Sequence, residues 1–94
     1  MIHAQEVEQV LREHSGVVDV AVIGLPSAEL GQEVVAFVVA RGPIDLKDLI
    51  RFARIKLAGY KVPSRIEIVE ALPRNVAGKI VKAALLPEVS DASG

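Results

Sequence analysis

The chain contains no cysteine and no tryptophan, and it is poor in aromatic residues, having only Phe37, Phe52 and Tyr60. Without thiols, disulfides, thiolate metal sites and cysteine nucleophiles are excluded. Half of the 94 residues are hydrophobic (51%) and a quarter are charged (24%), which is the composition of a globular domain. The length fits one small domain, whose core must be built from aliphatic side chains.

Long apolar runs are absent as well. The longest uninterrupted run, residues 34–40, has seven residues, whereas a membrane helix needs about 18 to 20. Residues 1–6 lack the basic and apolar regions of a secretory signal. We therefore expect no membrane span and a cytoplasmic location.

The formal net charge is −1, but the charged residues are distributed unevenly along the sequence. Residues 1–46 hold two arginines against seven acids, whereas residues 47–82 hold nine lysines and arginines against three acids. The positive second part indicates either a surface for an anionic ligand or partner, or the solvated faces of ordinary helices. Nucleic acid is not expected as a partner, because aromatics are nearly missing and the isoelectric point is 6.1.

Hydrophobic spacing predicts the first half of the fold. Apolar residues recur at helical spacing over residues 4–14, which predicts an amphipathic helix. Residues 17–25 are rich in β-branched side chains and predict a strand, followed by a loop over residues 26–31. Residues 32–41 predict a second strand that is apolar on both faces and is therefore central in its sheet.

A second helix is predicted over residues 46–57. Asp45 precedes it as the expected N-cap, and Asp48 adds a favourable negative charge in the first turn. The opposite face of this helix carries Lys47, Arg51 and Arg54. Its predicted buried stripe consists of Leu46, Leu49, Ile50, Ala53 and Leu57.

The C-terminal third predicts one more strand and one more helix. Residues 65–70 alternate in polarity and predict a strand with Ile66 and Ile68 facing inward. A loop over residues 71–78 leads into a short helix over residues 80–86, which Pro87 stops.

The order helix, strand, strand, helix, strand, helix predicts an α+β fold. We expect a small three-stranded sheet with two amphipathic helices packed mainly on one face and a short C-terminal helix. The expected domain covers residues 2–86, and residues 87–94 are expected to form a disordered tail.

Gly78 and Lys79 are the first candidate for chemistry, because a loop delivers this pair in front of a predicted helix. A phosphate-binding P-loop is excluded, since Pro73 occupies the position of its first glycine and Ile80 replaces its hydroxyl residue. Lys79 can still present a mobile positive charge to a phosphate or carboxylate oxygen. From these residues alone, a solvated surface lysine is the favoured interpretation.

Other catalytic patterns are missing. His3 and His14 have no acid at ligand spacing, so no metal site is expected, and His14 is expected to cap its helix or to lie half-buried. Glu67 and Glu70 are an odd number of residues apart and cannot share a strand face as an acid–base pair. No nucleophile elbow or triad context surrounds Ser15, Ser27 and Ser64.

Five segments in order resemble a known family: IHAQEVEQVL, VDVAVIGLP, LGQEVVAFVV, LAGYKVP and ALPRNVAGKI. Together they look like the small C-terminal domain of the adenylate-forming enzymes, which include acyl-CoA synthetases, firefly luciferase and the adenylation domains of peptide synthetases. The resemblance covers residues 2–86. The sequences of the motifs LAGYKVP and LPRNxxGKI are similar to those of fatty or aryl acid:CoA ligases.

The resemblance implies roles for particular residues. Lys79 matches the family's C-terminal catalytic lysine, which enters the active site of a large N-terminal domain during adenylation, and Gly78 shapes the loop that carries it. Arg54 matches by its spacing an arginine that binds the phosphate of CoA, although a solvated helix residue is an equal alternative. The complete enzyme is expected to use ATP, Mg²⁺ and CoA, with none bound tightly by this domain.

The chain also departs from the family pattern. The hinge that should precede Ile2 and the large domain with its phosphate loop and acid pocket are absent, so independent binding of ATP or acid is not expected. Ala77 stands where a hydroxyl residue is usual, and Ala4 replaces a frequent proline. These two changes weaken only the local match.

The resemblance therefore implies the mobile lid domain of an ATP-dependent acid:CoA ligase, excised or separately encoded, which does not turn over alone. Its expected partner is the large N-terminal domain. Two alternatives stay open: a standalone interaction module that kept the fold but lost the reaction, and an adenylation subdomain of a peptide synthetase, which would pass its product to a carrier protein. The acid substrate cannot be predicted, because its pocket belongs to the large domain.

Overall fold

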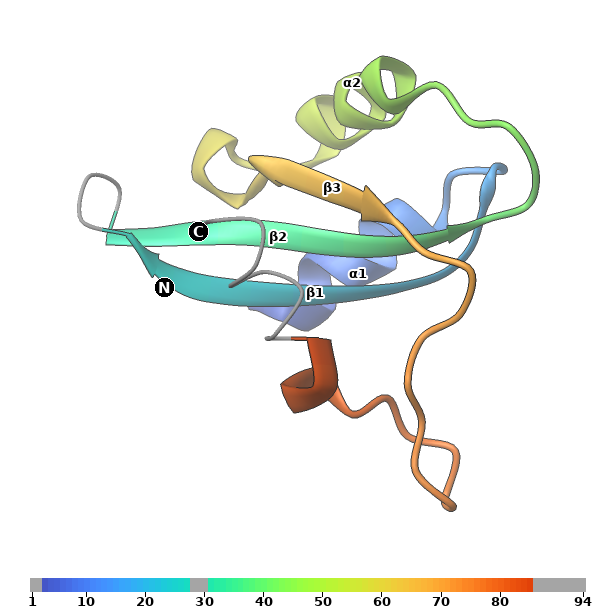
Figure 1. The fold of residues 1–94 in the computed structure, drawn as a ribbon. Helices are drawn as coiled ribbons and strands as arrows, with labels where there is room; N and C mark the ends of the chain where they lie inside the picture. The colour runs from blue at the N-terminus through green and yellow to red at the C-terminus, as the bar shows by residue number, and fades with distance from the viewer. Residues whose placement is uncertain (1–2, 28–30, 86–94) are drawn as a thin grey trace.

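The computed structural model of the chain describes residues 3–27 and 31–85. Its elements follow the predicted order (Figure 1). They are α1 (Ala4–Arg12), β1 (Val17–Ser27), β2 (Gly31–Ala40), α2 (Leu46–Lys56), the 3₁₀ turn η1 (Gly59–Lys61), β3 (Arg65–Ile68) and the 3₁₀ turn η2 (Lys82–Leu85). The prediction of a three-stranded α+β fold is confirmed.

The sheet has the strand order β1-β2-β3, so the prediction of a central second strand is confirmed. β1 and β2 form an antiparallel hairpin, whereas β3 runs parallel to β2. A parallel neighbour needs a crossover, and the segment that contains α2 provides it between β2 and β3. Residues 34–38 of β2 are buried on both faces of the sheet, as a central strand requires.

The first hairpin is longer than predicted, and the prediction of a loop beginning at Pro26 is wrong. Pro26 pairs with Gln32 and Ser27 with Gly31. The backbone N–H groups of Val20 and Val22 donate to the side chains of Asp19 and Glu8 rather than to carbonyls of β2, so alternate N–H groups of edge strand β1 point away from β2. Pro26 lies an even number of residues from Val20 and Val22, so its backbone nitrogen also points away from β2. The missing N–H of proline therefore costs no hydrogen bond between the two strands.

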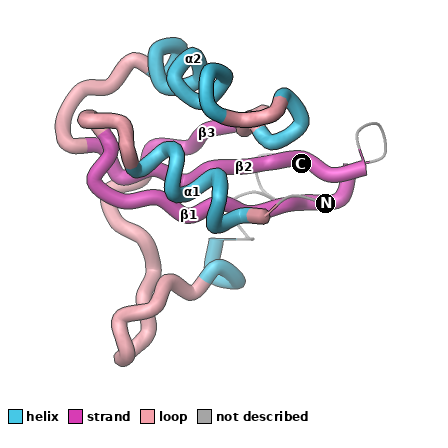
Figure 2. Tube along the Cα trace, turned by 180° about the vertical axis from the view of Figure 1, so that it is seen from behind, coloured by secondary structure: helices cyan, strands magenta, loops and turns pink. Residues whose placement is uncertain are grey.

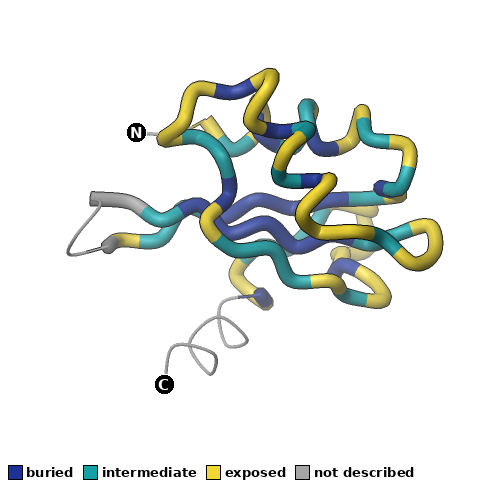
Figure 3. Tube along the Cα trace, turned by 90° about the horizontal axis from the view of Figure 1, so that it is seen from above, coloured by how far each residue is buried: buried dark blue, intermediate teal, exposed yellow. Residues whose placement is uncertain are grey.

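Two apolar layers enclose the sheet. Figures 1 and 2 show α1 and α2 on one face, as predicted, and the C-terminal segment on the other; Figure 3 shows the buried strands between them. The helix-side cluster contains Val7, Leu11, Val17, Val20, Val22, Val34, Ala36, Val38, Leu49, Ala53 and Leu57. The opposite cluster contains Ala21, Ile23, Val35, Phe37, Leu72 and Leu85. The second face is thus covered by residues that were predicted as loop and short helix.

The predicted apolar stripes are too wide in two places. On α2, Leu49 and Ala53 are buried, but Leu46 is 39% exposed and Ile50 is half-buried, because the sheet covers only the centre of the stripe. On β3, Ile66 packs against the helix-side cluster, whereas Ile68 is 46% exposed at the end of this four-residue edge strand.

The predicted short C-terminal helix over residues 80–86 is present as the 3₁₀ helix η2, but it begins two residues later than predicted. Ile80 forms an antiparallel bridge with Arg74, and only residues 82–85 form a short 3₁₀ turn. The backbone at residues 79–81 bonds across to residues 73–75 and is therefore extended rather than helical. Pro87 and the predicted tail lie outside the described residues.

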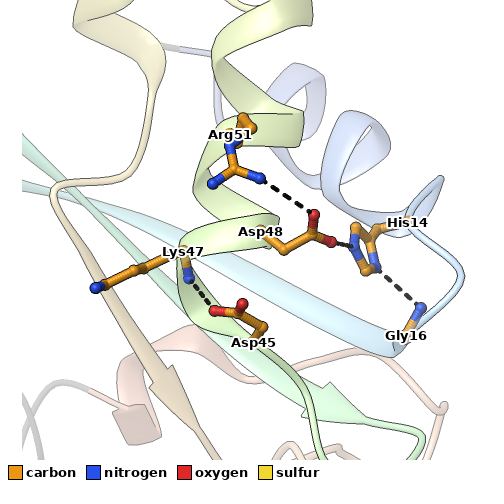
Figure 4. Close-up of polar contacts among 6 residues, drawn as sticks. All are labelled: His14, Gly16, Asp45, Lys47, Asp48 and Arg51. Atoms are coloured by element: carbon orange, nitrogen blue, oxygen red, sulfur yellow. Dashed lines mark hydrogen bonds and ion pairs between the residues drawn. The ribbon is translucent and has the colours of Figure 1, made fainter.

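The junction of the two helices explains several polar residues (Figure 4). Asp45 caps α2, because its side chain accepts the N–H of Lys47 at 2.9 Å, as predicted. His14, just beyond α1, lies 2.8 Å from Asp48 of α2 through Nε2, and its Nδ1 accepts the N–H of Gly16 at 2.9 Å. The half-buried structural role predicted for His14 is therefore confirmed.

Within the described ranges, no helix has both the length and the hydrophobicity required to cross a bilayer.

Candidate functional site

The predicted site residues Gly78 and Lys79 lie in a tight hairpin between Pro73 and Val81. The N–H of Asn75 donates to the carbonyl of Lys79 at 2.9 Å, and the N–H of Val81 donates to the carbonyl of Pro73 at 2.8 Å. The hairpin closes where the N–H of Gly78 donates to the carbonyl of Asn75 at 2.9 Å. Figure 1 shows this segment as the orange loop that extends away from the sheet.

The residues Asn75 and Gly78 explain the turn. The side-chain oxygen of Asn75 accepts the N–H groups of Ala77 at 2.9 Å and of Lys79 at 3.1 Å, as asparagine does at the first position of a turn. Gly78 has a φ of 85°, a left-handed conformation that costs glycine nothing. A three-residue loop that ends in such a glycine is a common hairpin connection. Lys79 follows it at once.

The base of the hairpin packs on the sheet, while its tip is exposed. Leu72 before it and Leu85 after it are buried in the cluster on the helix-free face, and Ile80 packs against that cluster. Val76, Ala77 and Lys79 are exposed. The arrangement presents the lysine on a short, internally bonded turn rather than on a loose loop.

Ion pairs within the chain account for most of the uneven charge distribution. Four acids of the first half pair with cations of the second half: Glu6 with Lys61, Glu8 with Lys82, Glu13 with Lys56, and Asp19 with Arg74. Two more cations pair with acids of their own half, Arg51 with Asp48 and Arg65 with Glu67. Charge separation along the sequence therefore reflects contacts inside the fold more than a ligand surface.

Three cations of the second half remain without an ion pair among the residues that the structure describes: Lys47, Arg54 and Lys79. Two of them are the predicted site residues. Lys47 extends away from the acids at the start of α2 (Figure 4). An unpaired, exposed cation keeps its charge available to an external anion, whereas a paired one must first break an internal contact.

The structure does not bring Arg54 and Lys79 together. Arg54 lies on the exposed side of α2, in an open hollow that it lines with Leu46, Lys47, Ile50 and Arg51. α2 covers one face of the sheet, whereas the lysine hairpin is anchored on the other. A single ligand held against Lys79 therefore does not reach Arg54 in this conformation.

Lys61, in the LAGYKVP segment, has a structural role that the sequence did not reveal. Its ammonium group lies 2.6 Å from the carboxylate of Glu6 and joins η1 to α1. The hydrogen bond with Glu6 raises the pKa of Lys61, and partial burial opposes this rise. This lysine stays charged and is held by its partner.

Metal ligands are not gathered anywhere in residues 3–27 and 31–85: no group of three histidine, aspartate or glutamate side chains is placed to hold an ion. Sequence reasoning missed Asn75, although asparagine three residues before a glycine is a turn signal. It also missed Arg74 and Asp19, which are 55 residues apart and carry no joint signal in the sequence.

Comparison with known proteins places these features in a family. Residues 6–79 match the model of the AMP-binding enzyme C-terminal domain. The chain is 43% identical over 88 residues to a long-chain-fatty-acid–CoA ligase of Salmonella typhimurium, covering 93% of this chain and 16% of that protein. It is 46% identical over 79 residues to a 2-succinylbenzoate–CoA ligase of Listeria monocytogenes, covering 84% and 17%.

A solved structure shows the same fold. The o-succinylbenzoate CoA synthetase of Bacillus subtilis, in complex with its acyl-adenylate intermediate, superposes with a TM-score of 0.85 at 31% identity, covering 89% of this chain and 17% of that one. The chain thus spans about a sixth of the length of the curated relatives that it matches. It belongs to the family of AMP-binding enzyme C-terminal domains.

Proposed function

We propose that this chain, over residues 2–86, is the mobile C-terminal domain of an ATP-dependent acid:CoA ligase that acts on a fatty or aryl acid in the cytoplasm. Its partner is a large N-terminal adenylate-forming domain, linked covalently or acting in trans. The observation that carries the proposal is Lys79, which has no ion-pair partner in the described part of the chain and is held at the tip of an ordered hairpin in a chain of this family.

Lys79 would act in the adenylation step. A carboxylate oxygen of the acid attacks the α-phosphorus of ATP, pyrophosphate leaves, and negative charge accumulates on the oxygens around the reacting centre. A cation placed against these oxygens in a site that excludes water lowers the barrier by about 3 to 4 kcal/mol. The exposed position of Lys79 suits entry into a site built by another domain.

In this proposal the large domain binds ATP, the acid substrate and Mg²⁺. ATP and the acid need an enclosed pocket, whereas the hollow beside Arg54 is open to solvent. Mg²⁺ prefers carboxylate ligands and phosphate oxygens, and the described residues do not gather carboxylates for it. The small domain then contributes the ammonium group of Lys79, which it carries into the active site by moving as a whole.

Thioester formation would use the opposite face of the domain. Arg54 pairs with no acid among the described residues and lies beside Lys47, so this side of α2 can attract a CoA phosphate. Because Arg54 and Lys79 lie on opposite sides of the sheet, the domain must turn between the two steps to present each of them. Both curated relatives named above are CoA ligases, which favours CoA over a carrier protein as the acceptor.

A chimera tests the proposal. The C-terminal segment of the Salmonella typhimurium ligase is replaced by this chain, and ATP–pyrophosphate exchange is measured with a long-chain fatty acid. We expect no exchange with the 94-residue chain alone and measurable exchange with the chimera. Lys79→Ala in the chimera should reduce exchange by roughly 10²- to 10³-fold, the usual cost of removing one preorganised charge-stabilising group.

Lys47→Ala is the matched control, because Lys47 is also exposed and unpaired among the described residues but lies on the side of α2. It should leave the exchange rate unchanged, since exchange does not involve CoA. Equal exchange by Lys79→Ala and the unmodified chimera would contradict the proposal.

A further inference from the structure

The guanidinium group of Arg74 bridges two parts of the chain. One terminal nitrogen forms an ion pair with the carboxylate of Asp19, and the other donates to the carbonyl of Gly78 at 2.7 Å. Asp19 is itself fixed at the start of β1, because its other oxygen accepts the N–H of Val20 at 2.9 Å and its side chain is only 22% exposed. Arg74 therefore connects the rigid sheet to the tip of the hairpin.

The contact with Gly78 acts directly on the lysine. The carbonyl that Arg74 holds belongs to the peptide group between Gly78 and Lys79, and the N–H of that same peptide group donates to the side chain of Asn75 at 3.1 Å. Because a peptide group is planar, fixing both its oxygen and its nitrogen fixes its orientation. This restraint acts at the glycine, where the chain would otherwise rotate most freely. The direction in which the Lys79 side chain leaves the backbone follows from it.

The rest of the hairpin is anchored without Arg74. Pro73 and Val81 are joined by a backbone hydrogen bond, and Leu72 and Leu85 are buried against the sheet. Lys82 pairs with Glu8 at 2.8 Å, and that carboxylate also accepts the N–H of Val22. Loss of Arg74 should therefore leave the hairpin folded and release only the orientation of its tip.

We propose that Arg74 and Asp19 are positioning residues that aim Lys79 for the adenylation step. The inference rests on the proposed role of Lys79. Arginine suits the task because its planar, forked group donates to the carboxylate and the carbonyl at the same time. A lysine at position 74 keeps the charge opposite Asp19 but offers a single nitrogen, which does not reproduce the two-armed bridge.

The test separates the two steps of the reaction in the same ligase chimera. Adenylation is followed by ATP–pyrophosphate exchange, and thioester formation by the reaction of presynthesised acyl-adenylate with CoA. Arg74→Lys should reduce kcat for exchange by roughly 10- to 100-fold, because a displacement of about 1 Å costs on that order. KM for ATP and the rate of thioester formation should stay unchanged, since neither depends on the aim of Lys79.

Asp19→Asn should act in the same direction, and the double variant should be no slower than Arg74→Lys alone, because both changes break one bridge. Arg65→Lys is the matched control: it makes the same exchange in another arginine ion pair, with Glu67 on β3. It should leave both steps unchanged. Thermal unfolding followed by circular dichroism checks that every variant is folded.

The outcomes distinguish this inference from the proposed function. If Lys79→Ala blocks exchange but Arg74→Lys and Asp19→Asn do not slow it, the positioning role is refuted and the function of Lys79 stands. An equal loss in thioester formation would assign Arg74 to general stability and would also refute the positioning role. If Lys79→Ala exchanges normally, the proposed function fails and the inference falls with it.

Discussion

Replacing Gly78 by alanine should lower the free energy of unfolding by about 1 kcal/mol. A Cβ atom built on Gly78 would meet no heavy atom within 4 Å, so no clash contributes. The cost comes from the φ of 85°, since a left-handed conformation costs an L residue about 1–2 kcal/mol. Alanine also reduces the entropy of the unfolded chain, which offsets roughly 0.4–1 kcal/mol of this cost.

Urea unfolding of the 94-residue chain, followed by far-ultraviolet circular dichroism, measures the effect. With m values of roughly 1–3 kcal/mol/M, the midpoint should fall by about 0.5 M while m stays constant. Gly78→Asn should lose less, because asparagine tolerates the left-handed conformation better than alanine does. Asparagine is larger than alanine, so a steric cause would give it the greater loss of stability. A smaller loss for asparagine would therefore point to the backbone conformation.

Gly59→Ala is the matched control. A Cβ at Gly59 also meets nothing within 4 Å, but its φ is not in the left-handed range. The same substitution should therefore raise the free energy of unfolding by roughly 0.4–1 kcal/mol. If both glycine-to-alanine variants shift the midpoint in the same direction by the same amount, the backbone conformation of Gly78 is not the cause and the reasoning is refuted.

Two further predictions concern the helices. Asp45→Ala should cost about 1 kcal/mol in urea unfolding, because it removes the side-chain cap of α2, whereas Asp45→Asn should cost little; equal losses in both variants would argue against capping. The bond with Glu6 raises the pKa of Lys61 above its ordinary value of 10.5, so this pair stabilises the fold fully below that value and loses its effect as pH rises through the higher folded-state pKa. The stability difference between the wild type and Glu6→Gln, measured from about pH 9 to about pH 12, should therefore shrink only at the alkaline end; a difference that is constant over this range would contradict the assignment.

Secondary structure was predictable wherever its signals are local. The spacing of apolar residues found both helices, and Asp45 marked the start of α2 because capping involves neighbouring residues. Errors appeared where a second element decides the outcome. Leu46 fits the apolar stripe of α2 but is partly exposed, because periodicity defines the direction of a stripe and the packing partner defines its width.

In the C-terminal segment, too, local signals predict the structure only in part, and packing against the sheet decides the rest. Residues 71–86 have no periodic pattern, and the helix expected after Lys79 is limited to η2. The chain instead turns back at Gly78 and lays Leu72, Ile80 and Leu85 on the second face of the sheet. Burial of Leu72 and Leu85 and the packing of the half-buried Ile80 offset the cost of ordering an irregular segment. No pattern within the segment predicts that it covers this face of the sheet.

The charges of the two halves are a third example. Their separation along the sequence was interpreted as a ligand surface or as solvated helix faces, yet Glu6, Glu8, Glu13 and Asp19 neutralise cations of the second half inside the fold. Contacts between residues tens of positions apart depend on the path of the chain, which net charge does not describe.

The order of the helices and strands, the aliphatic core and the turn at Asn75 and Gly78 follow from residues close to one another along the chain, because hydrophobic period, capping and turn chemistry act over a few positions. The resemblance that singled out Lys79 also comes from the sequence, through five segments in a fixed order. Tertiary structure alone decided that Arg54 and Lys79 lie on opposite sides of the sheet, and that Arg74 meets Asp19 beside the peptide group of Lys79. These relations depend on how three strands, two helices and an irregular segment pack around a shared core, and packing joins residues that the sequence keeps apart.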